Sequence, residues 1–210
     1  DMAKATHMAI ENAGLTIEDI EWIGIGTPGA VNNETGEIIF AGNLDFHDIN
    51  MKKMMEERLH LTTYVENDAN AAAFGECLAG AAKDVKYCVM VTLGTGVGGG
   101  IIIDGKIYSG YNHAAAEVGH MVIERNGVPC SCGRRGCMEA YASVTGLIRM
   151  TKEAMMKDED SEMWKEVNGD INAVNGRTSF DAMRKGDVSA QKVVDEYIEY
   201  LGNGISSFVN

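Results

Sequence analysis

One histidine and three cysteines in this chain have the spacing of a metal-binding loop. The cysteines are Cys130, Cys132 and Cys137, and His120 stands ten residues before the first of them. Glycines between the cysteines allow the backbone to turn the sulfur atoms toward one point. One imidazole and three thiolates complete a tetrahedral zinc site, and such a closed site is structural because a catalytic zinc keeps one position open. The pattern therefore predicts a structural zinc that braces a loop.

Two other interpretations of these cysteines stay open. They are a disulfide with one thiol left over, and three small buried apolar residues. Nothing at the start of the chain resembles a signal peptide, so we expect a cytoplasmic protein whose thiols stay reduced. That expectation favours a metal over a disulfide.

Two carboxylates flank the predicted metal ligands. Glu117 precedes His120 by three residues, and Glu139 follows Cys137 by two. A metal that ties His120 to Cys137 also brings these carboxylates together, and each ionised carboxylate accepts two or more hydrogen bonds. A pair of this kind beside a rigid loop suits a ligand with several hydroxyl groups. The pattern points to a sugar.

The whole stretch resembles the signature of the ROK family, which includes bacterial glucokinases, other hexose kinases and sugar-responsive transcriptional repressors. The matching residues run as Glu117-x-Gly119-His120, then Gly127-x-x-Cys130-x-Cys132-Gly133-x-x-Gly136-Cys137-x-Glu139-x-x-x-Ser143. Ala116 departs from the pattern, because the family favours glycine before the glutamate. The resemblance implies a two-lobed α/β fold of the actin-like ATPase (ribonuclease H-like) type. It also implies that His120 contacts sugar through the ring nitrogen that does not meet zinc.

Asn67 and Asp68 stand between a predicted strand at 61–66 and an alanine-rich predicted helix. Asparagine and aspartate are preferred helix N-caps, so a purely structural role for Asp68 stays open. The run Glu-Asn-Asp-Ala-Asn resembles the family segment in which the aspartate is the catalytic base and the preceding asparagine holds the sugar. The resemblance therefore assigns these two roles to Asp68 and Asn67.

A glycine-rich run at 94–100 interrupts two apolar strands predicted at 86–92 and 101–103. Strand, turn and strand form a hairpin, which fits neither a Walker A loop nor a dinucleotide fingerprint. A plain hairpin stays open as the alternative. The resemblance implies that Gly94, Thr95 and Gly96 lie under the phosphates of ATP, whose companion ion is magnesium.

Two further positions resemble parts of the family's sugar pocket. Gly29 follows a strand predicted at 21–27, in a turn where open α/β sheets bind ligands, although it also suits a simple bend. Asn43 follows a strand predicted at 37–40, and its amide offers both a donor and an acceptor. The resemblance assigns both residues to substrate binding.

The remaining periodicity predicts helices at 3–13, 51–59, 138–156, 178–184 and 188–205, with a break of the third near Ser143. On the second helix we expect inward side chains at Met51, Met54, Met55 and Leu59. On the last we expect one apolar stripe, which is either core or interface and consists of Val193, Val194, Tyr197, Ile198, Leu201 and Ile205. The polar run from Lys157 to Gly176 is expected to be solvated surface.

Composition limits the function classes. The 210 residues carry a net charge of −13, which argues against a nucleic-acid surface on this segment. No apolar run approaches the roughly 20 residues that span a bilayer. The sequence starts within a predicted helix and lacks the family's Asp-x-Gly-Gly-Thr turn. We therefore expect the interior of a longer protein, with residues 1–67 from a small lobe and 68–210 from a large lobe.

These features together predict an enzyme that phosphorylates a hexose with ATP, and the expected acceptor is the 6-hydroxyl of glucose. Asp68 would deprotonate that hydroxyl, and a homodimer is expected from the family. Two alternatives stay open: a sugar-responsive transcriptional repressor, and a sugar-binding module without catalysis. Which hexose is used does not follow from the sequence, because epimers differ by one hydroxyl.

Overall fold

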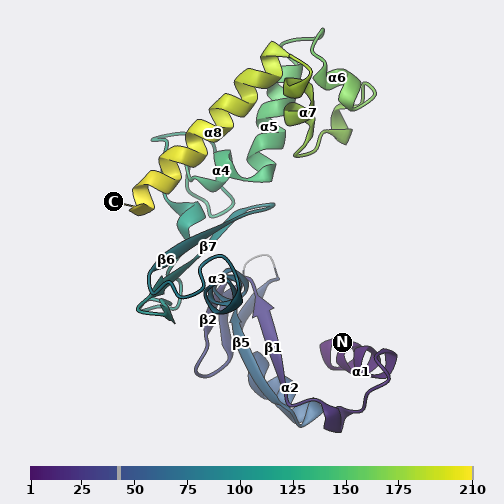
Figure 1. Cartoon of the computed structure of the whole chain (residues 1–210), viewed down its shortest axis with the longest axis vertical. Helices are drawn as coiled ribbons and strands as arrows, with labels where there is room; N and C mark the ends of the chain where they lie inside the picture. Colours follow the sequence, from purple (N-terminus) through teal and green to yellow (C-terminus); the bar gives the residue numbers. More distant parts are fainter. Residues whose placement is uncertain (42–43, 210) are drawn as a thin grey trace. The chain divides into compact units, whose positions relative to one another are not determined.

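The computed structural model describes residues 1–41 and 44–209, and they form two units (Figure 1). Unit 1 comprises Asp1–Met90 and Gly100–Ala116, and unit 2 comprises Val91–Gly99 and Glu117–Asn210. Asn43, one of the predicted sugar-binding residues, lies outside the described residues. The predicted lobe boundary after Asn67 remains a prediction. No helix among the described residues is long and apolar enough to cross a membrane.

Two small sheets and three helices make up most of unit 1. A parallel pair joins β1 (Trp22–Thr27) to β5 (Thr62–Asn67), in a register that runs from Trp22 opposite Thr62 to Thr27 opposite Asn67. An antiparallel sheet has the order β2-β3-β4. Its strands, and the helical elements of this part, are β2 (Ala30–Asn32), β3 (Glu37–Ala41), β4 (Phe46–Asn50), α1 (Met2–Asn12), η1 (Ile17–Asp19), α2 (Met51–Leu59) and α3 (Asp68–Ala79).

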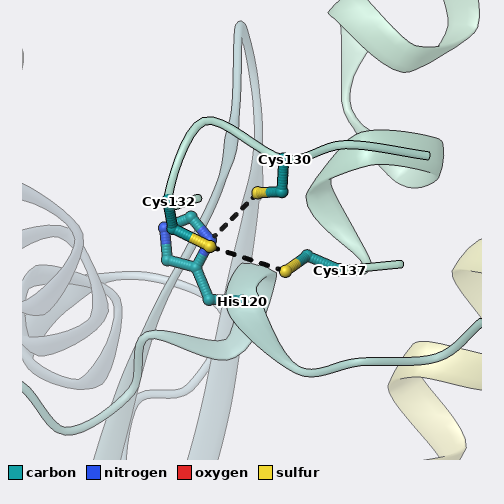
Figure 2. A group of neighbouring side chains, drawn as sticks. All are labelled: His120, Cys130, Cys132 and Cys137. Atoms are coloured by element: carbon teal, nitrogen blue, oxygen red, sulfur yellow. Dashed lines mark hydrogen bonds between the residues drawn. The ribbon is translucent and has the colours of Figure 1, made fainter. Parts of the chain in front are cut away.

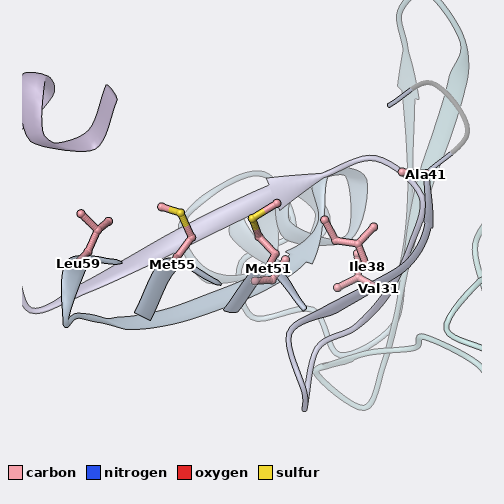
Figure 3. Close-up of a cluster of buried hydrophobic side chains, with 7 residues drawn as sticks. Val31, Ile38, Ala41, Met51, Met55 and Leu59 are labelled. Atoms are coloured by element: carbon pink, nitrogen blue, oxygen red, sulfur yellow. The ribbon is translucent and has the colours of Figure 1, made fainter. Parts of the chain in front are cut away.

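One apolar cluster holds α2 against these strands (Figure 3). Its buried members are Val31, Ile38, Ala41, Met51, Met55, Leu59 and Val65. Met51, Met55 and Leu59 recur every four residues and so share one face of α2. Met54 was expected inward, and this expectation is wrong because 41% of its surface is exposed. Met54 precedes Met55 by one residue, so its side chain points about 100° away from that of Met55 around the helix axis and faces solvent.

A three-stranded antiparallel meander, ordered β6-β7-β8, follows α3. Its strands are β6 (Cys88–Leu93), β7 (Val97–Ile103) and β8 (Lys106–Ile107). The predicted hairpin is confirmed, but its turn is shorter than expected, since Gly98, Gly99 and Gly100 lie inside β7. A side chain at Gly100 would meet Ala73 Cβ at 2.4 Å. That glycine therefore allows α3 to approach the strand closely, which is a recognised use of glycine within a strand.

Unit 2 is mainly helical. Its elements are η2 (Val118–His120), α4 (Glu139–Ala142), α5 (Val144–Met155), α6 (Met163–Glu166), η3 (Ile171–Ala173), α7 (Thr178–Arg184) and α8 (Val188–Val209). The predicted break near Ser143 is confirmed. Ser143 has an extended backbone, and its Oγ accepts the Gly146 amide at 3.0 Å, so this serine caps α5.

The helices of unit 2 enclose a core that the sequence only partly predicted. Met163, Val167 and Val174 are buried in a cluster with Met155, Ala182 and Ala190. The expectation that 157–176 is solvated surface is therefore wrong for these side chains. On α8, Val193, Val194 and Tyr197 are buried as expected. Ile198 and Ile205 belong to the same predicted stripe, for which core and interface were both open, and they are 54% and 40% exposed.

Candidate metal centre and neighbouring acidic residues

The loop between Cys130 and Cys137 is shaped by its own backbone hydrogen bonds. Gly133 N–H donates to Cys130 O at 3.0 Å, and Cys130 N–H donates to Arg134 O at 2.9 Å. Gly136 adopts a φ of +78°, and a side chain there would meet Glu124 O at 1.7 Å. Only glycine suits both that backbone conformation and that close approach. The loop consequently returns on itself and presents three thiols on one side.

His120 and the three cysteines converge as predicted (Figure 2). Their four ligand atoms all lie within 4.8 Å of one another. His120 Nδ1 is 3.5 Å from Cys130 Sγ, and Cys132 Sγ is 3.6 Å from Cys137 Sγ. In a tetrahedral zinc site the Zn–S bonds are about 2.3 Å and the Zn–N bond is about 2.0 Å. These lengths separate two sulfurs by about 3.8 Å and a sulfur from a nitrogen by about 3.5 Å. The residues therefore fit zinc in number, type and spacing.

All five cysteines of the chain are among the described residues and carry free thiols. The three loop thiols differ in their electrostatic surroundings. Hydrogen bonds from the Arg134 backbone and then from its guanidinium lower the pKa of Cys132 to about 6. Burial, followed by hydrogen bonding to Cys132 and Cys130, raises the pKa of Cys137 to about 12. Arg134 also donates to the backbone carbonyl of His120 at 2.9 Å, so its cation lies between that carbonyl and the Cys132 thiol.

The second ring nitrogen of His120 points away from the thiols. Nε2 lies 4.0 Å from Glu117 Oε2, which is the long end of the range for an ion pair. A carboxylate beside the outer nitrogen of a metal-bound histidine fixes the orientation of the ring. His120 is thus placed to join a metal on one side to the Glu117 carboxylate on the other.

Glu139 links the metal loop to the glycine turn within unit 2. Its Oε1 accepts Ser131 Oγ at 3.0 Å, and its Oε2 accepts the Val97 amide at 3.1 Å. A side chain at Gly96 would meet that Oε2 at 2.3 Å, so the turn needs glycine to approach the carboxylate. Glu139 was predicted to hold sugar, and neither of these contacts was predicted: Val97 is 42 residues away in the chain, and Ser131 carried no motif of its own.

The turn at 94–96 is also tied to the start of α5. Gly94 O accepts the Val144 amide at 2.9 Å, and Thr95 O accepts Thr145 Oγ1 at 2.7 Å. Gly94 N–H donates to Gly96 O at 3.0 Å. The start of α5 therefore positions the turn that was predicted to meet phosphate.

In unit 1 the structure brings Gly29, Asn67 and Asp68 together, at the carboxyl end of the parallel pair β1 and β5. Asn67 Nδ2 donates to Gly29 O at 3.0 Å. Asn67 is the N-cap of α3, because its Oδ1 accepts the Asn70 amide at 3.0 Å. Asp68 is the first residue of that helix, and its Oδ1 accepts the Ala69 amide at 2.8 Å. The cap is therefore Asn67, and Asp68 lies just inside the helix.

Glu66 is a residue of this site that sequence reasoning missed. Its Oε1 accepts the Asn67 amide at 2.9 Å and Asn70 Nδ2 at 3.3 Å, while its Oε2 accepts Asn33 Nδ2 at 2.8 Å. The carboxylate thereby ties the segment after β2 to the junction of β5 and α3. Glu66 directly precedes Asn67 in the Glu-Asn-Asp-Ala-Asn segment, and that position was the signal that could have placed it in the site.

The ROK family model matches residues 1–210. The chain belongs to the ROK family. It is 39% identical to a glucokinase of Halalkalibacterium halodurans over 91% of the chain and 58% of that protein. It is 35% identical to a glucokinase of Thermotoga maritima over 92% of the chain and 61% of that protein. A xylose repressor of Bacillus subtilis is 38% identical over 90% of the chain and 44% of that protein. This ROK chain thus spans about half of these relatives' length.

Solved ROK structures agree with the fold of this chain. A ROK family glucokinase from Streptomyces griseus in complex with glucose and AMPPNP superimposes with a TM-score of 0.84 at 34% identity, over 98% of this chain and 66% of that one. A ROK hexokinase from Thermus thermophilus superimposes with a TM-score of 0.74 at 31% identity, over 99% of this chain and 63% of that one. A ROK transcriptional regulator, a homologue of the Escherichia coli MLC protein, superimposes with a TM-score of 0.86 at 26% identity, over 100% of this chain and 52% of that one. The predicted actin-like α/β fold and the family assignment are confirmed.

Proposed function

We propose that the complete protein containing this chain transfers the γ-phosphoryl group of ATP to a hexose, with glucose as the best-supported acceptor. The observation that carries this proposal is the match to the glucokinase solved with glucose and AMPPNP, which extends over 98% of the chain. The glucokinase relatives at 35–39% identity support the same reaction.

Asp68 is the proposed catalytic base. A carboxylate that accepts the proton of the sugar 6-hydroxyl lets that oxygen bond to the γ-phosphorus while the bond to the β-phosphate oxygen breaks and ADP leaves. Asp68 Oδ1 already accepts the Ala69 amide, which fixes the side chain at the start of α3. The network of Glu66 and Asn67 holds the same junction, so the base is positioned before substrate arrives.

We also propose a role for each of the other predicted site residues. Sugar contacts are proposed for Gly29, Asn43, Asn67, Glu117, His120 and Glu139. Gly94, Thr95 and Gly96 are proposed to meet the phosphates of ATP, whose magnesium offsets charge on the transferred group. His120, Cys130, Cys132 and Cys137 would hold a structural zinc that fixes the orientation of His120 and the loop carrying Ser131. A homodimer of the complete protein is also proposed, and light scattering of the purified protein measures it.

The test is a coupled assay of ADP release by the complete protein, with ATP, magnesium and, in turn, glucose, N-acetylglucosamine, N-acetylmannosamine and fructose. Asp68→Asn removes the base and should lower kcat by about 10²- to 10⁴-fold, with a much smaller change in KM for the sugar. Asp104→Asn makes the same chemical change in an exposed turn of positive φ, where asparagine is tolerated, and should leave kcat unchanged. Full activity in Asp68→Asn, or no turnover of any of these sugars, contradicts the proposal.

A sugar-responsive transcriptional repressor is the second candidate. The xylose repressor of Bacillus subtilis at 38% identity and the transcriptional regulator with a TM-score of 0.86 favour it. The net charge of −13 argues against a DNA-binding surface on this segment, so a repressor would read DNA through another part of the protein. Calorimetric binding of glucose or xylose without ATP turnover, together with sugar-dependent DNA binding, would establish this alternative. Sugar binding without either activity would indicate a binding module.

A further inference from the structure

Cys77 and Cys88, the two cysteines outside the candidate metal centre, lie in contact within unit 1. Their sulfur atoms are 3.4 Å apart, well beyond the roughly 2.05 Å of a disulfide bond, so both are free thiols. Cys77 stands in the last turn of α3, and Cys88 is the first residue of β6. Both side chains are half-buried, which leaves the pair within reach of a small reagent.

Local structure keeps the two thiols together. Cys77 extends the buried stripe of Ala69 and Ala73 along α3, at the four-residue spacing of one helix face. The segment from α3 to β6 then folds back through short turns. Glu76 anchors the first turn, because its carbonyl accepts the Gly80 and Ala82 amides and its Oε2 accepts the Ala81 amide at 2.7 Å.

A second metal site does not account for this pair. Within residues 1–41 and 44–209, the group of three or more potential ligands that could hold a metal is the one around His120. Two thiols without a third ligand fall short of the four that a structural zinc needs. Two thiols in contact are, however, the reactants of a disulfide bond, and this chemistry needs no further side chain.

We propose that Cys77 and Cys88 form a reversible disulfide on exposure to a small disulfide such as oxidised glutathione. The Cys77 thiolate attacks one glutathione sulfur, forms a mixed disulfide and releases one glutathione thiolate. The Cys88 thiolate then attacks Cys77 Sγ and releases the second. The two cysteine sulfurs are oxidised, the oxidised glutathione is reduced to two thiols, and these take up the two protons that the cysteines lose.

The surroundings of Cys88 set this order of attack. Burial raises the pKa of Cys88, and the hydrogen bond and charge of Cys77 raise it further. Cys88 is consequently the poorer first nucleophile. Once Cys77 carries glutathione, its thiolate charge and its thiol hydrogen bond are gone, so both of those causes disappear and Cys88 ionises more readily. Cys77 therefore acts as the attacking residue and Cys88 as the resolving residue.

The disulfide would join the end of the helix that begins at Asp68 to the strand that leads to Gly94. Closing the loop from Cys77 to Cys88 restricts the unfolded chain, so the midpoint of thermal unfolding should rise by about 5 °C on oxidation. This inference does not depend on the proposed kinase activity, because its readouts are thiol chemistry and unfolding.

The experiment treats the zinc-loaded complete protein with oxidised glutathione, blocks the remaining thiols with iodoacetamide and maps peptides by mass spectrometry. Zinc protects the thiolates of Cys130, Cys132 and Cys137. The expected product is a Cys77–Cys88 cross-linked peptide that dithiothreitol reverses. Cys88→Ser should instead accumulate one glutathionyl group on Cys77, and Cys77→Ser should accumulate much less on Cys88. Serine is close in size to cysteine, and the unfolding midpoint of each reduced variant checks that it folds.

Several results would overturn the inference. The first is a wild-type protein that keeps both thiols free at glutathione concentrations that modify Cys77 in Cys88→Ser. The second is a wild-type protein that carries glutathione on both cysteines without a cross-link. The third is a Cys88→Ser variant that forms no adduct on Cys77. An unfolding midpoint that rises equally in wild type and Cys77→Ser would place the effect elsewhere in the chain.

Discussion

Gly119→Ala should damage the metal centre without touching a metal ligand. Gly119 lies in the short turn η2, between Val118 and His120, and packs against Val97 of β7. A methyl group at Gly119 would lie 2.0 Å from Val97 O and 2.9 Å from Val97 Cβ. Ordinary contact begins at 3.4 Å, so the turn and the strand must separate by about 1.4 Å.

That separation acts on both sides of the contact. The imidazole of His120 follows Gly119 directly, and the Val97 amide is the donor that holds Glu139 Oε2. Overpacking of this kind costs about 1–3 kcal/mol of unfolding free energy. Displacing the support of a metal-bound histidine typically weakens metal binding by about 10- to 100-fold. We therefore expect both losses in the same variant.

The assay is zinc competition against a chromophoric chelator, followed by urea denaturation of the zinc-saturated protein. Gly202→Ala is the matched control, because a side chain at Gly202 in α8 meets nothing within 4 Å. Alanine is a better helix former than glycine by about 1 kcal/mol, so this control should keep its zinc affinity and be at least as stable as wild type. Equal zinc affinity in Gly119→Ala and Gly202→Ala would refute the reasoning about this contact.

Two further predictions concern the helical part of unit 2. Met163→Ala should lower the free energy of unfolding, measured by urea denaturation, by about 2–5 kcal/mol, because Met163 is fully buried. Met156→Ala is the control and should lower it by less than about 0.5 kcal/mol, because Met156 is 62% exposed. Equal losses would contradict the packing of α6. Asp187 precedes α8 and accepts the Ala190 amide and Ser161 Oγ. Burial raises the pKa of Asp187, but these hydrogen bonds outweigh it and hold the pKa below its usual value. A lowered folded pKa stabilises the protein above the unfolded value of about 3.9, and this contribution is lost as pH falls through the folded value. Asp187→Ala should therefore cost about 1 kcal/mol at pH 7 and progressively less below pH 4, and a cost independent of pH would contradict this account.

Local patterns were enough to predict much of the secondary structure. The bounds of α2 and α7 agree with the apolar spacing of Met51–Leu59 and with the Thr178–Arg184 segment. The convergence of the three cysteines with His120 followed from spacing and ligand chemistry. These features depend on residues that are near one another in the chain, so a period or a motif reveals them.

The missed features depend on contacts between distant or sparse residues. Met163, Val167 and Val174 recur at near-helical spacing, but the structure forms only one short helix and one 3₁₀ turn in this polar run, so their burial comes from packing against other helices and not from one continuous helix face. Gly100 looked like part of a turn, because composition does not distinguish a bend from the close approach of Ala73. Cys77 and Cys88 meet through the turns between α3 and β6, and no motif joins them.

The most direct test of the account is X-ray absorption at the zinc edge of the purified complete protein, with the zinc content measured on the same sample. We expect one zinc per chain, with three sulfur ligands at about 2.3 Å and one nitrogen at about 2.0 Å. A protein without stoichiometric zinc, or a zinc surrounded mainly by oxygen, would contradict the metal centre at His120, Cys130, Cys132 and Cys137.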